Sequence, residues 1–242
     1  MKPLEQIVEK LQDAFGSTLV SVILYGSAAS EDGTDRYSDF NIFCVLKQLT
    51  PNELEQAEPV LHWWQEQGNP SPLLMSEAEV YRSADSFPIE FRDMQQRRRV
   101  LYGVDIIAEM AVHDTHYRAH VEHELRVNLL RLRQRGAGML SVPENLLGLC
   151  ADSVTTFCAL ARHALTLAGI DPAPKRRGVL EQLHEKCHLD VEVLALLLDI
   201  REDRSPELPD RFTTPRLIFS EYLLAIARLI DFVDHLHDGR EP

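Results

Sequence analysis

Three features are missing from this sequence of 242 residues. No apolar run is long enough to span a bilayer, and the first fifteen residues lack the long apolar stretch of a secretion signal. There is no excess of positive charge: 25 Lys and Arg against 38 Asp and Glu give a net charge of −13. That balance argues against a protein that coats nucleic acid, although one nucleotide could still bind in a locally basic pocket.

Paired cysteines are missing too. The four cysteines are widely scattered, none forms a C-x-x-C pair, and their neighbours are mostly apolar. Buried free thiols in a reducing compartment explain this pattern most simply. We therefore expect a soluble, cytoplasmic protein that binds no membrane.

The two halves of the chain differ in pattern. Up to about residue 110, helical stripes alternate with short β-branched and apolar runs, whereas later apolar residues recur at three- and four-residue spacing. The sequence therefore predicts an α+β protein, with a small mixed β-sheet domain over 1–110 followed by an all-α helical bundle domain over 111–242. In the first half we expect helices near 4–11 and 51–68 and strands over 18–25, 39–46, 72–75, 88–94 and 98–103. In the second half we expect helices over 114–136, 144–169, 179–188, 191–203 and 215–238.

A Gly-Ser pair, Gly26 and Ser27, closes the first apolar strand. A turn of this kind, followed by a helix start, offers free backbone N–H groups and a hydroxyl. Such groups suit phosphate oxygens, which the dipole of a helix N-terminus also attracts. The pair therefore predicts a phosphate-binding turn.

The next strand carries two oxygen-bearing side chains at alternate positions, Asp39 and Asn41. Period-two spacing points both to one face with Phe43, while Phe40, Ile42 and Cys44 point to the other. Oxygen ligands beside a phosphate site suit Mg²⁺, which binds through one or two carboxylates plus substrate phosphates.

A third oxygen-bearing side chain, that of Glu90, lies inside the expected strand 88–94, where a charged residue is unusual unless it has a function or points outward. Three oxygen ligands around two metal ions would suit in-line attack on the α-phosphorus of a nucleoside triphosphate. Asp93 is a weaker substitute for Glu90. The competing interpretations are structural: Asp39 and Asn41 would satisfy backbone donors at a strand start, and Glu90 would face solvent.

The run YGSAASEDGTDRYSDFN resembles the signature of the DNA polymerase β-like nucleotidyltransferase superfamily, and PIEF resembles the strand of its third carboxylate. The helical half resembles the bundle of kanamycin- and streptomycin-type aminoglycoside nucleotidyltransferases, and also HEPN-type helical domains. The resemblance implies transfer of a nucleoside monophosphate from ATP or another NTP to a hydroxyl acceptor, either a small molecule or a protein, with Mg²⁺.

Carried over by residue, the resemblance makes Gly26 and Ser27 the phosphate-binding turn, and Asp39 and Glu90 catalytic metal ligands, with Glu90 a ligand or general base. Asn41 takes the second acid's place and departs from the pattern. An amide oxygen can coordinate Mg²⁺ but brings no charge, and at about 4 Å with an effective dielectric of about 20 a charge pair is worth roughly 4 kcal/mol before desolvation. The alternative is therefore a catalytically inactive, nucleotide-binding or regulatory protein of the same fold.

Arginines of the helical half supply further candidates. Because two-domain members of the family bind nucleotide between their domains, the resemblance implies that Arg126 or Arg133 reaches the triphosphate. Solvated surface arginines are the competing interpretation.

Two other sequence patterns and one further function class leave alternatives open. His184-Glu-Lys-Cys-His188 matches the H-E-x-x-H zinc motif, but Lys186 places a cation inside it and no third ligand is evident, so we favour chance. Apolar helices such as YLLAIARLIDFV could form the bundle core or a homodimer interface. A structural helical adaptor is a third function class.

Overall fold

The structure is a computed structural model that describes residues 3–29, 40–108, 110–202, 204 and 210–236. The chain forms two compact units, Met1–His116 and Tyr117–Pro242. The sequence pattern predicts a boundary after residue 110, and the assignment of a separate functional domain to each half remains our proposal.

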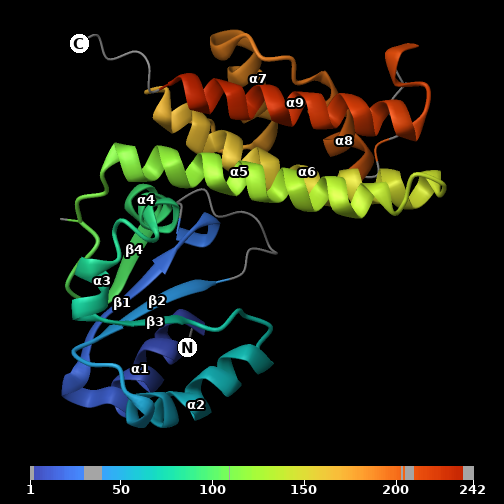
Figure 1. Cartoon of the computed structure of the whole chain (residues 1–242). Coiled ribbons are helices and arrows are strands. Elements are labelled where there is room, and N and C mark those ends of the chain that lie inside the picture. The colour runs from blue at the N-terminus through green and yellow to red at the C-terminus, as the bar shows by residue number, and fades with distance from the viewer. Residues whose placement is uncertain (1–2, 30–39, 109, 203, 205–209, 237–242) are drawn as a thin grey trace, which may run out of the picture. The chain divides into compact units, whose positions relative to one another are not determined.

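Unit 1 is built on a four-stranded mixed sheet with the strand order β3-β2-β1-β4 (Figure 1). The strands are β1 (Leu19–Tyr25), β2 (Asn41–Leu46), β3 (Leu73–Ser76) and β4 (Arg98–Gly103). β1 pairs antiparallel with β2 and with β4, while β2 and β3 run parallel. In this register Tyr25, the last residue of β1, lies opposite Asn41 of β2 and Arg98 of β4.

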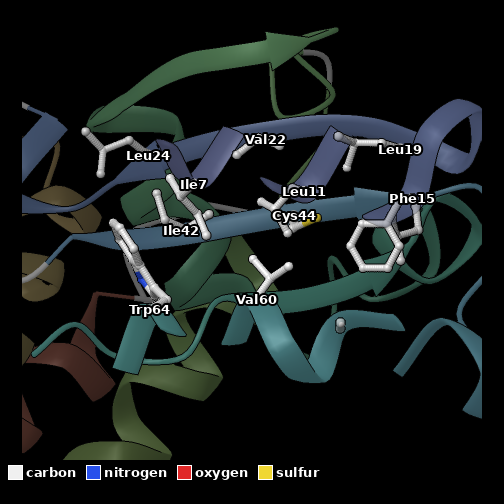
Figure 2. Packing of buried hydrophobic residues seen from close by; sticks show 12 residues of the cluster. Ile7, Leu11, Phe15, Leu19, Val22, Leu24, Ile42, Cys44, Val60 and Trp64 are labelled. Atoms are coloured by element: carbon white, nitrogen blue, oxygen red, sulfur yellow. The ribbon is translucent and has the colours of Figure 1, made fainter. Parts of the chain in front are cut away.

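One face of this sheet is covered by α1 (Pro3–Phe15) and α2 (Pro51–Glu66). Alternate residues of the strands point into this layer and form its apolar core, since successive side chains of a strand face opposite sides. Figure 2 shows this packing, with Trp64 of α2 beside Ile42 of β2. The core members that it labels are Ile7, Leu11, Phe15, Leu19, Val22, Leu24, Ile42, Cys44, Val60 and Trp64.

The opposite face of the sheet is covered by α4 (Pro88–Gln96), whose Phe91 ring lies 6.3 Å from that of Phe43 on β2. The expected strand over 88–94 is therefore wrong. Pro88 occupies a first-turn position of the helix, where its missing N–H costs nothing. The buried residues Pro88, Phe91 and Met94 then recur every three residues, which is a helical spacing.

A short helix, α3 (Glu77–Arg82), which the sequence pattern does not predict, connects β3 to this region. Ser76 caps it: its hydroxyl accepts from the Glu79 backbone N–H, and the Glu79 carboxylate accepts from the Ser76 backbone N–H.

Unit 2 is all-α over its described residues, apart from connecting segments and one short 3-10 turn (Asp210–Phe212). α6 packs against α7, α8 and α9, and its inward side is lined by buried residues such as Leu149, Val154 and Phe157. The predicted α+β fold class, a small mixed sheet followed by a helical domain, is confirmed. The helices are α5 (Asp114–Ala137), α6 (Pro143–Leu167), α7 (Arg176–Cys187), α8 (Glu192–Arg201) and α9 (Pro215–His235).

All four cysteines are free thiols, as expected. Cys44, Cys150 and Cys158 are buried, and burial raises the pKa of each to about 12, whereas Cys187 is partly exposed. Among the described helices, none combines the length and apolarity needed to cross a membrane.

Candidate functional site

The predicted phosphate turn follows β1 directly. Gly26 has a φ of +79°, a left-handed conformation that suits glycine, and the 3-10 helix η2 (Ser27–Ala29) comes next. The backbone N–H of Gly26 donates to the carbonyl oxygen of Arg97 at 3.1 Å. The Gly26 N–H is therefore engaged within the sheet, so N–H groups for a phosphate would have to come from η2, and the phosphate-binding role of the turn stays a prediction.

Gly26 also lies against the neighbouring strand. A Cβ atom at this position would stand 3.3 Å from the side-chain nitrogen of Asn41. Any larger residue would thus combine an unfavourable φ with pressure on Asn41. The turn and the amide predicted as a metal ligand are neighbours.

Asn41 begins β2 and is half-buried. Ile42 and Cys44 belong to the core under α1 and α2, so Asn41 and Phe43 point to the opposite face, as the alternation predicts. Asp39 and the side chain of Ser27 lie outside the described residues, and their assigned roles stay predictions.

Glu90 lies in the first turn of α4 rather than on a strand, and its side chain is exposed. Because α4 covers the face that carries Asn41 and Phe43, the helix still brings Glu90 to the side of the sheet where the prediction needs it. Burial, and second the negative charge of Glu90, raise the pKa of Tyr25. Tyr25 pairs with Asn41 across the strands, so all three side chains share this region.

Tyr25 lies in the candidate site, and the sequence prediction did not include it. Its position immediately before Gly26 is a signal, but its face becomes known only from the antiparallel register that sets it opposite Asn41. Its phenol is a hydrogen-bonding group held close to a carboxylate.

A cavity of about 380 Å³ adjoins Glu90. Its wall is mainly apolar, with two carboxylates, those of Glu79 and Glu90. Hydrogen bonds from the backbone N–H and the hydroxyl of Ser76, both 2.7 Å, lower the pKa of Glu79 and hold it as an anion. Glu90, by contrast, forms no hydrogen bond or ion pair with the described residues. The lining residues are Leu73, Leu74, Met75, Glu79, Phe87, Glu90, Phe91 and Met94.

The predicted metal ligands are only partly described. Asn41 and Glu90 offer one amide oxygen and one carboxylate, and the part of the chain that the structure covers contains no cluster of three His, Cys, Asp or Glu suited to a metal. The donors are nevertheless hard oxygens of the kind that Mg²⁺ takes together with substrate phosphates. The H-E-x-x-H motif is interrupted, because α7 ends at Cys187 and His188 lies beyond it with a φ of +56°.

The two predicted nucleotide-binding arginines belong to unit 2. Arg126 donates to Glu122 at 2.7 Å and lies 3.9 Å from Asp234. Arg133 is exposed and forms no ion pair with the residues described. Their proposed contact with nucleotide stays a prediction.

A known structure shares this arrangement of a small mixed sheet followed by helices, and it belongs to the nucleotidyltransferases. It is the crystal structure of spectinomycin adenyltransferase AAD(9) from Enterococcus faecialis with ATP and spectinomycin. The two chains are 13% identical and superpose with a TM-score of 0.57, over 96% of this chain and 98% of that one. At this identity the likeness shows the fold alone. No family model and no curated protein match the sequence. The HEPN-like character of unit 2 stays a prediction.

Proposed function

We propose that this protein is a nucleotidyltransferase that moves a nucleoside monophosphate from ATP or another NTP to a hydroxyl acceptor. The hydroxyl oxygen would bond to the α-phosphorus, and the α–β phosphoanhydride bond would break and release pyrophosphate. The proposal rests on one observation: the Gly26 turn, Asn41 and Glu90 lie in one region of unit 1. The fold shared with an adenyltransferase crystallised with ATP and spectinomycin supports it. Fold likeness by itself would not establish the activity.

Each residue has a proposed role. Gly26 and Ser27 would hold the triphosphate, and Asp39, Asn41 and Glu90 would hold Mg²⁺, which supplies charge neutralisation of the phosphates. Glu90 has a second task, which its exposed and unpaired carboxylate suits: accepting the proton of the acceptor hydroxyl.

The cavity beside Glu90 is the proposed position of the acceptor. Its volume of about 380 Å³ lies within the range of small-molecule sites. The anionic Glu79 and Glu90 favour an acceptor that carries positive charge, and the apolar wall favours contact with its carbon skeleton. We therefore expect a small molecule in preference to a protein side chain.

The second candidate function is an inactive nucleotide-binding or regulatory protein of this fold. Asn41 favours it, because the amide leaves the described part of the site with one carboxylate, Glu90, for a divalent cation. Replacing Asn41 with Asp restores the acidic pattern and separates the two candidates.

The test is transfer of label from α-³²P-labelled ATP with Mg²⁺ to a panel of hydroxyl compounds that begins with spectinomycin. We expect labelled product with the unaltered protein, and a loss of about a hundredfold or more with Glu90→Gln. Glu55→Gln is the matched control, since it removes one exposed carboxylate from α2, on the other face of the sheet.

The results of this assay distinguish the transferase from the inactive nucleotide-binding protein. Equal losses in Glu90→Gln and Glu55→Gln would remove Glu90 from the mechanism. If no compound is labelled by the unaltered protein but Asn41→Asp gains Mg²⁺-dependent ATP affinity by about tenfold or more, the inactive candidate is correct. Absence of both labelling and ATP binding in every variant would overturn both candidates.

A further inference from the structure

Unit 2 holds a larger cavity that plays no part in the proposed transfer site. It has a volume of about 540 Å³ and lies in the groove between α5 and α6. Residues of α5 at helical spacing form one wall and residues of α6 at helical spacing form the other. The lining residues are Asn128, Arg131, Leu132, Gln134, Arg135, Leu149, Asp152, Ser153, Thr156 and Phe157.

Two arginines give this cavity a positive wall. Arg131 and Arg135 are one helical turn apart on α5, both are exposed, and neither forms an ion pair or hydrogen bond with the described residues. The sequence contains no acid between Glu124 and Glu144, so nothing on this stretch of chain neutralises them. Arg133 of the same helix is also unpaired among the described residues, so what distinguishes Arg131 and Arg135 is that both line one cavity of a protein whose net charge is −13.

The single acid among the lining residues is already matched. Asp152 accepts a hydrogen bond from Arg201 of α8 at 3.0 Å, so the charge of this pair adds nothing against an anion. The Ser153 hydroxyl donates to the Cys150 carbonyl oxygen at 3.0 Å, and its oxygen can then accept from the Tyr222 hydroxyl at 3.1 Å. Asp152 and Ser153 of α6 are thus engaged by their own partners, whereas Thr156, Gln134 and the two arginines line the cavity without a side-chain hydrogen bond to the described residues.

The floor of the cavity is apolar. Leu132, Leu149 and Phe157 line it, and each is at most 5% exposed. Cationic side chains at the mouth and apolar side chains below suit a ligand with one anionic end and one apolar end. Guanidinium groups pair with carboxylates and phosphates through two parallel hydrogen bonds, which a Lys pair would not provide.

We propose that the α5–α6 cavity binds a small organic anion: an apolar, preferably aromatic, body that carries a carboxylate or a phosphate. Arg131 and Arg135 hold the anionic group, and the body lies on Leu132, Leu149 and Phe157. The site belongs entirely to unit 2 and does not depend on the proposed transfer reaction.

A structural explanation competes with this one. Cations near a helix C-terminus interact favourably with the helix dipole, and α5 ends at Ala137. That explanation applies best to Arg135, which lies in the last turn of α5, and to Arg133 at least as well as to Arg131, which lies farther from the helix end and lines the cavity. The single variant Arg131→Gln, compared with Arg133→Gln, therefore separates ligand binding from helix stabilisation, because both residues precede the last turn and only Arg131 lines the cavity.

The experiment is a fluorescence titration of the full chain with 8-anilinonaphthalene-1-sulfonate, an aromatic anion, without nucleotide or Mg²⁺. We expect the double variant Arg131→Gln/Arg135→Gln to weaken binding about tenfold or more. Arg133→Gln, the matched control on the same helix but outside the cavity, should change the Kd by less than about twofold. Circular dichroism verifies that each variant is folded.

Phenyl phosphate and phenylacetate then serve as separate competitors and identify the preferred anionic group. We expect at least one of the two compounds to displace the probe from the unaltered protein. Neither compound should displace the probe from the double variant. Equal weakening by Arg133→Gln, unchanged binding by the double variant, or failure of both competitors would overturn it. As a second variant, Arg131→Lys/Arg135→Lys keeps the charge and should retain more affinity than the Gln pair.

Discussion

Replacing Gly26 with Ala is the perturbation that separates the proposed phosphate turn from a merely structural one. Gly26 has a φ of +79°, and its Cβ would stand 3.3 Å from the Asn41 amide nitrogen. Gly68, in the same unit, has a φ of +82°, with no atom within 4 Å of a built Cβ. Gly68→Ala therefore measures the cost of the left-handed backbone alone.

Comparing Gly26→Ala with Gly68→Ala gives the expected changes in the free energy of unfolding. Alanine in the left-handed region costs about 1–2 kcal/mol, and the loss of unfolded-state entropy returns about 0.4–1 kcal/mol. Gly68→Ala should therefore lower the free energy of unfolding by about 1 kcal/mol. Gly26→Ala adds one tight contact that Asn41 can relieve by a small shift, worth roughly 0.5 kcal/mol more. ATP affinity, in contrast, should fall about tenfold or more in Gly26→Ala alone.

The assay uses urea unfolding followed by tryptophan fluorescence, together with ATP titration of each folded variant. Both tryptophans, Trp63 and Trp64, lie on α2, so their emission reports unit 1. If Gly26→Ala and Gly68→Ala reduce ATP affinity equally, or if neither does, then the turn at Gly26 has no part in binding nucleotide.

Three further predictions concern packing, thiols and pH. Gly136→Ala should destabilise unit 2 by about 1–3 kcal/mol because its Cβ would collide with the Phe219 ring. In a Phe219→Ala background the same change should stabilise unit 2 by about 1 kcal/mol through helix propensity. Urea unfolding followed by circular dichroism measures both effects. Ellman's reagent at pH 8 should modify only Cys187 in the folded protein, since the other three thiols are buried, and Cys187→Ser should abolish the reaction. Hydrogen bonds led by that of the Thr50 hydroxyl lower the pKa of Glu53 to about 2 from an ordinary 4.5. The stability from this cap is thus present above pH 4.5 and lost as the pH falls toward 2, so the urea midpoints of the unaltered protein and Glu53→Gln should converge at low pH.

The sequence predicts most elements because their local signals agree with the fold. The strand over 98–103 has the predicted bounds: it ends at Gly103, which has a φ of +76° and whose Cβ would collide with the Val20 carbonyl. The helices of unit 2 are predicted within a few residues, since their apolar stripes are long and regular.

The sequence predictions fail where contacts between distant residues determine the local structure. In the stretch 88–94, Ile89 and Phe91 flank Glu90 and suggest a strand, but Pro88 starts a helix that packs on Phe43. The hydrogen bond from the Gly26 N–H to the Arg97 carbonyl joins residues 71 positions apart, and no local pattern encodes it. The approach of Tyr25 to Glu90 likewise needs the register of the sheet. The roles of Asp39 and Ser27 remain predictions from the sequence motif.

The most direct test of the central claim is calorimetric titration of ATP into this protein with and without excess Mg²⁺. The proposed site predicts micromolar binding that strengthens with Mg²⁺, weakens about tenfold or more in Gly26→Ala, and is kept in Arg131→Gln/Arg135→Gln, which removes only the anion site of unit 2. Binding lost in the arginine variant but kept in Gly26→Ala would place the nucleotide in the α5–α6 cavity and contradict the transfer site. No binding under either condition would contradict the nucleotidyltransferase altogether.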